Sequence, residues 1–82
     1  MMDLRAEAQR LFQVAVAAAD PARALSRAFL TTPPTRPVGD GKLLLLAVGK
    51  AAIPMAETAL AALGDTRVQA LIVTNAENAR PV

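Results

Sequence analysis

The sequence predicts an α/β fold in which an N-terminal helical hairpin precedes a β-α-β unit. Two segments before residue 31 repeat apolar residues at helical spacing, which indicates helices. Two later segments, Leu43–Val48 and residues 68–74, are short and mostly apolar, and a helical pattern separates them. Strand, helix and strand within about 33 residues form a unit with two parallel strands. We therefore divide the chain into a helical hairpin at 1–30, a Pro/Gly linker at 31–41 and, at 42–82, the βαβ start of a truncated α/β domain, an incomplete piece of a Rossmann-like parallel-sheet domain.

The first 30 residues predict two successive helices. The first, at about residues 3–19, places most polar side chains away from an apolar stripe made by Leu4, Ala8, Leu11, Phe12, Ala15 and Ala19. Asp20 and Pro21 predict the start of the second helix, because Asp is a good N-cap and Pro is favoured at the first helical position. We expect that helix to end near Leu30. A membrane-surface or partner-binding role for the first helix is the alternative, but its polar face is not strongly basic.

The linker at 31–41 contains three prolines, which exclude regular helix, and its Gly-Asp-Gly sequence predicts a turn. The apolar run Leu43–Val48 shows no polar alternation, so we expect a strand of a parallel sheet with helices on both faces. The helix at 51–63 has a predicted core stripe of Met55, Ala59, Ala62 and Leu63, and Gly64 ends it. Residues 68–74 predict the second strand.

Two parallel strands do not make a stable sheet by themselves, since three or more are normally needed. Both edges of the predicted pair are open, and residues 75–82 show no structural pattern. We therefore expect that the natural chain continues past Val82. The alternative is that a partner chain supplies the missing strands.

The composition excludes several functional classes. The net charge is +2, but the nine basic residues form no run and no Tyr or Trp is present to stack bases, so we expect no nucleic-acid partner. The absence of cysteine and histidine removes thiolate metal sites and the commonest metal ligand, and we assign no metal ligand. Because no targeting segment and no apolar run long enough to span a bilayer is present, we expect a cytoplasmic chain that does not associate with membranes.

The candidate site lies where the first strand meets the following helix, at Gly49 and Lys50. Backbone N–H groups in the first turn of a helix lack partners and carry partial positive charge, and Lys50 adds a full charge there. Gly49 permits close approach of a ligand, so a phosphate or carboxylate is favoured. The sequence fits neither a Walker A loop nor a G-x-G-x-x-G fingerprint. The alternative is a solvated lysine, although a cation at a helix N-terminus opposes the macrodipole.

The surrounding residues resemble a known family. The sequence Val-Gly-Lys-Ala-Ala-Ile-Pro-Met-Ala at residues 48–56 is similar to the V-G-x-G-K-A-x-x-M-A signature of bacterial glycerate 2-kinases, which are also labelled hydroxypyruvate reductases. Residues 11–21 are similar to the opening L-F-x-A-A-V-x-A-x-D-P of that family, and residues 70–74 to its G-x-V-V-T strand. Ala47 departs from the usual glycine, and the later G-H-P-x-P-D segment and second domain are absent from these 82 residues.

The resemblance implies an enzyme that uses ATP and Mg²⁺ to phosphorylate the 2-hydroxyl of glycerate. It implies a catalytic role for Lys50 and substrate binding by Gly49 and Lys50. Thr74 and Asn75 end the second strand on the same side, so they are candidates by geometry, with an ordinary strand-to-loop turn as the alternative. The hypothesis is thus the N-terminal part of a glycerate 2-kinase-like enzyme, inactive as an isolated chain. The alternative is a non-enzymatic α/β interaction module that uses an exposed sheet edge.

Overall fold

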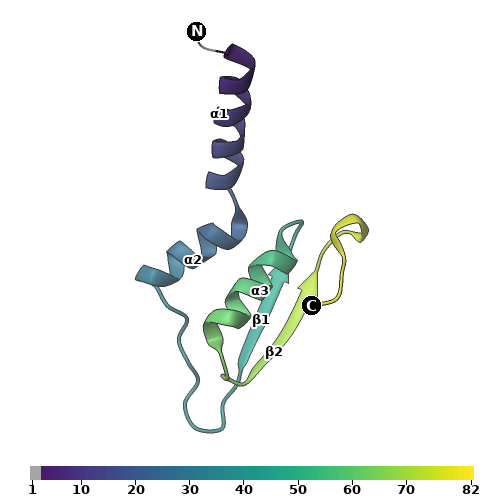
Figure 1. Cartoon of the computed structure of the whole chain (residues 1–82). Coiled ribbons are helices and arrows are strands. Elements are labelled where there is room, and N and C mark those ends of the chain that lie inside the picture. The colour runs from purple at the N-terminus through teal and green to yellow at the C-terminus, as the bar shows by residue number, and fades with distance from the viewer. Residues whose placement is uncertain (1–2) are drawn as a thin grey trace.

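The computed structural model describes residues 3–82 and has the predicted α/β architecture (Figure 1). Two helices come first, a strand-helix-strand unit follows, and a 3-10 turn lies near the end. In chain order the elements are α1 Leu4–Ala18, α2 Pro21–Thr31, β1 Leu43–Val48, α3 Ala52–Leu63, β2 Val68–Val73 and η1 Ala76–Asn78. The predicted fold class is confirmed, and the 3-10 turn is the one piece of regular structure in the tail that the sequence pattern did not indicate.

An aspartate caps the start of each of the first two helices, which the sequence predicts for Asp20 and the structure adds for Asp3. The Asp3 carboxylate accepts hydrogen bonds from the N–H groups of Arg5 and Ala6, at 3.1 and 3.3 Å. The Asp20 carboxylate accepts one from the N–H of Arg23 at 2.9 Å, with Pro21 in the first turn. Each bond satisfies a donor that the helix itself leaves free. Local capping therefore sets both helix starts.

The two helices do not pack side by side. Figure 1 shows α1 extending away from α2 and beyond the end of the sheet, while α2 lies against α3. No residue of α1 is buried. The arginine side chains of α2 hold the joint, because Arg23 and Arg27 donate to the carbonyl oxygens of Ala17 and Ala18, both at 3.4 Å. The predicted pair of helices is present, but it is an open one.

The linker is attached to the far end of α3 through one arginine. The Arg36 guanidinium donates to the carbonyl oxygens of Leu63 at 3.0 Å and Ala62 at 3.5 Å, and also to the hydroxyl of Thr66. These carbonyls lie in the last turn of α3, where helical partners are missing and a cation is favourable. Arg36 thus ties the linker to the strand-helix-strand unit.

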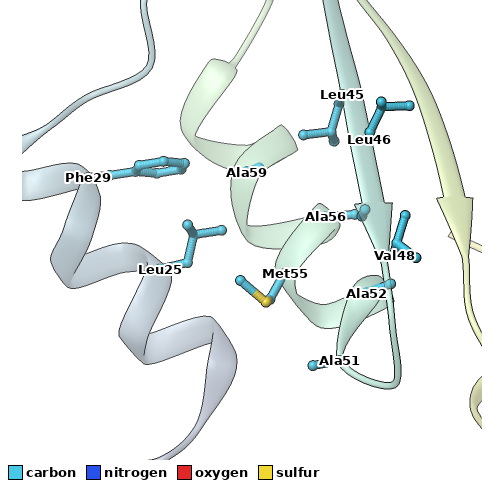
Figure 2. A pocket seen from close by; sticks show the side chains of 11 residues that line it. Leu25, Phe29, Leu45, Leu46, Val48, Ala51, Ala52, Met55, Ala56 and Ala59 are labelled. Atoms are coloured by element: carbon cyan, nitrogen blue, oxygen red, sulfur yellow. The ribbon is translucent and has the colours of Figure 1, made fainter.

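The sheet consists of β1 and β2, which run parallel in a register that pairs Leu43 with Val68 and Val48 with Val73. Helix α3 connects them and covers one face (Figure 1). The buried core lies on this helix and comprises Ala52, Ile53, Ala56, Ala59 and Leu63. The predicted stripe was right for Ala59 and Leu63 and wrong for Met55 and Ala62, which are exposed. The helix is rotated so that its small residues meet the sheet, and Met55 points toward α2 instead (Figure 2).

The second face of the sheet has no helix on it in residues 3–82, contrary to the expectation of helices on both faces. Leu44, Leu46 and Val48 alternate with less exposed neighbours and are 70%, 70% and 75% exposed. Figure 2 shows Leu45 pointing toward α3 and Leu46 pointing away from it. The apolar run predicts that helices cover both faces of the strand. In the structure α3 covers one face, and neither α1 nor α2 lies on the other.

Candidate functional site

The candidate site is the turn that joins β1 to α3. Gly49 continues the sheet ladder, because its N–H donates to the carbonyl of Val73 at 2.9 Å. The N–H of Ala52 then donates to the carbonyl of Gly49 at 3.2 Å and closes a tight turn. Gly49 has φ +125°, a conformation that L side chains rarely adopt, although a Cβ there would meet nothing within 4 Å. The backbone conformation, and not lack of space, is therefore the reason for glycine at this position.

The start of α3 is electropositive and has free donors. The structure gives the N–H groups of Lys50, Ala51 and Ile53 no hydrogen-bond acceptor among residues 3–82. Ala51 occupies the N-cap position and has no side-chain oxygen to cap the helix, and no acidic residue lies in the first turn. Unpaired N–H groups and the helix macrodipole at such an end both favour an anion.

Lys50 is exposed and carries its charge at this same turn. It forms no ion pair and no side-chain hydrogen bond with another residue in the part of the chain that the structure describes. Glu57, the acidic residue of α3, is instead paired with Arg80 at 2.5 Å. The turn therefore combines a glycine, free backbone donors and an unpaired ammonium group, which is a suitable arrangement for a carboxylate or phosphate.

Thr74 and Asn75 lie at the same end of the sheet as Gly49 and Lys50, because β1 and β2 are parallel and in register to their last residues. The side-chain oxygen of Asn75 accepts hydrogen bonds from Asn78 at 2.5 Å and from the Thr74 hydroxyl at 3.5 Å. Their position at the same end of the sheet as Lys50 agrees with the geometric expectation. The internal bonds fit the alternative of an ordinary strand-to-loop turn, and a role of these residues in binding stays a prediction.

The ion pair between Glu57 and Arg80 attaches the tail to α3 across 23 residues of sequence. The hydrogen bond from Arg80 holds the pKa of the Glu57 carboxyl below its ordinary value, and the same bond raises the pKa of Arg80. Sequence reasoning missed this contact, since nothing in residues 75–82 marks Arg80 as a partner of α3. Its consequence for the site is that the nearest helical carboxylate is already occupied.

A hollow lies beside the site, between α2, α3 and β1, with a volume of about 310 Å³. Figure 2 shows Leu25 and Phe29 of α2 facing Met55 and Ala59 of α3 across it. All of its lining residues are apolar. It therefore offers no polar side chain that could orient a charged substrate.

The described residues contain no cluster of the side chains that usually ligate metals. No group of three or more Asp, Glu, His or Cys side chains gathers anywhere within residues 3–82. Mg²⁺ is normally held by carboxylates together with substrate phosphates and water. No residue of this chain is assigned to Mg²⁺.

Comparison with known protein families gives a match. A family model described as "Domain of unknown function (DUF4147)" matches residues 7–82, which includes every strand, α2, α3 and most of α1. No curated protein and no solved structure matches the chain significantly. Over the described residues, none of the helices has the length and apolarity needed to cross a membrane.

Proposed function

We propose that this chain, which belongs to the family described as a domain of unknown function (DUF4147), binds the anionic substrate of a glycerate 2-kinase-like enzyme. The observation that carries the proposal is the unpaired Lys50 on a glycine turn that opens α3 at the carboxyl end of a parallel strand. Ligands of open α/β sheets bind beyond that end of the strands. The resemblance of residues 48–56 to the glycerate 2-kinase signature supports the choice of substrate.

In this proposal, Lys50 and the free N–H groups of the turn hold the carboxylate of glycerate or the phosphate in transfer. Phosphoryl transfer depends mainly on positioning and on neutralising negative charge, and a lysine does both. Gly49 lets the backbone turn tightly enough to present its neighbours to the ligand. ATP is the proposed phosphate donor and Mg²⁺ the proposed metal. The residues of this chain contribute the anion site alone.

The first test is the Lys50→Ala variant, assayed for ATP-dependent phosphorylation of D-glycerate in the protein that carries this domain. Removing one charge-stabilising group from an active site typically lowers turnover by about 100-fold or more, so we expect a loss of that size with the fold retained. Lys42→Ala is the matched control, because Lys42 lies at the opposite end of β1, where it donates to Gln69 of β2. Near-normal activity of the Lys50 variant, or equal losses in both variants, contradicts the assignment.

Binding separates the anion site from catalysis. In the 82-residue chain, titration with D-glycerate or inorganic phosphate is expected to shift the backbone NMR signals of residues 49–53 and to leave those around Lys42 unchanged. Lys50→Ala should abolish these shifts. We expect the isolated chain to show no kinase activity, because the family resemblance assigns the other substrate, metal and nucleotide contacts to segments that these 82 residues do not include.

The second candidate function is a non-enzymatic interaction module. The observation that favours it is the exposed apolar face of the two-stranded sheet, where large side chains such as Leu44 and Leu46 contact no covering element. Under this alternative, the protein that carries this domain does not phosphorylate glycerate, whereas substitutions on the sheet abolish binding of a partner.

A further inference from the structure

We draw no further inference here: the strongest candidate, the polar hollow of about 340 Å³ that Arg36 of the linker and Arg67 before β2 line together with Asp40 and Thr66, carries nothing because both guanidinium groups already donate to carbonyl oxygens of the fold and no feature of the described residues identifies a ligand for it.

Discussion

Helices α1 and α3 are both rich in alanine, yet they are stabilised in opposite ways. α1 begins at an aspartate whose carboxylate accepts two backbone hydrogen bonds, and it buries no residue. α3 begins at Ala51 without any side-chain cap, and it carries all five buried residues of the described chain. Local bonds therefore form α1, whereas packing on the sheet holds α3. Because packing holds it, α3 can leave its first N–H groups free beside Lys50.

The difference shows why the candidate site lies at α3 and not at α1 or α2. A capping carboxylate satisfies the free donors at a helix start and adds a negative charge there. Asp3 and Asp20 thus make the starts of α1 and α2 unsuitable for an anion. The start of α3 has neither a cap nor an acidic residue in its first turn. Binding capacity for an anion is available only where capping is absent.

The largest expected effect comes from deleting a buried side chain of α3. Ile53 is 4% exposed, and Ile53→Ala should lower the free energy of unfolding by about 2–5 kcal/mol through lost burial and the cavity left behind. Val14→Ala is the matched change in α1, where the side chain is 55% exposed, and it should stay within about 0.5 kcal/mol. Urea unfolding followed by circular dichroism, at one protein concentration, measures both. Similar losses in the two variants would contradict the conclusion that packing stabilises α3 but not α1.

A smaller effect is expected at the turn that starts α3. Gly49→Ala forces a residue with a Cβ into φ +125°, which should cost about 1–3 kcal/mol of the free energy of unfolding. Since the added methyl group meets no neighbour, the loss reflects backbone strain alone. The same variant should weaken the phosphate-induced NMR shifts of residues 49–53, because the turn that presents Lys50 is altered. Unchanged stability together with unchanged shifts would show that the turn tolerates another backbone conformation.

The smallest effect is expected from the ion pair that attaches the tail to α3. The pKa of Glu57 is lowered in the folded chain, so the pair stabilises the fold above the ordinary Glu pKa. That contribution is lost as the pH falls through the lowered value. Glu57→Gln should therefore be slightly less stable than the parent at neutral pH, and the difference should vanish in acid. Both side chains are exposed, so salt should also reduce the difference.

Glu7→Gln is the control for this change, because the pKa of Glu7 is lowered in the same direction by Arg10 within one helix. Amide hydrogen exchange distinguishes the two variants. Loss of the Glu57–Arg80 ion pair should speed exchange at Ala79, whose N–H donates to the carbonyl of Ala76 in the tail. Loss of the pair of Glu7 should change only α1. Equal exchange at Ala79 in both variants would mean that the tail is held by other contacts.

Several features followed from the sequence because their causes are local. Asp20 marks the start of α2, Gly64 follows the last residue of α3, and the run of apolar residues has the observed bounds of β1. Gly49 and Lys50 were placed correctly at the strand-helix turn for the same reason. The rotation of α3 was not predictable in this way. The predicted core positions Met55 and Ala62 were wrong because alanines lie on all sides of α3. The spacing of apolar residues alone therefore does not select the face that is buried.

By itself the sequence determined approximately where the helices and strands begin and end, and that a glycine and a lysine separate β1 from α3. Only the tertiary structure decided which surfaces meet. It directs α1 away from α2, leaves one sheet face bare, joins Arg36 to the end of α3, and pairs Glu57 with Arg80. The physical reason is the distance along the chain over which each kind of interaction acts. Caps and turns act within about four residues, whereas these contacts join residues that are far apart in the chain and depend on how whole elements pack.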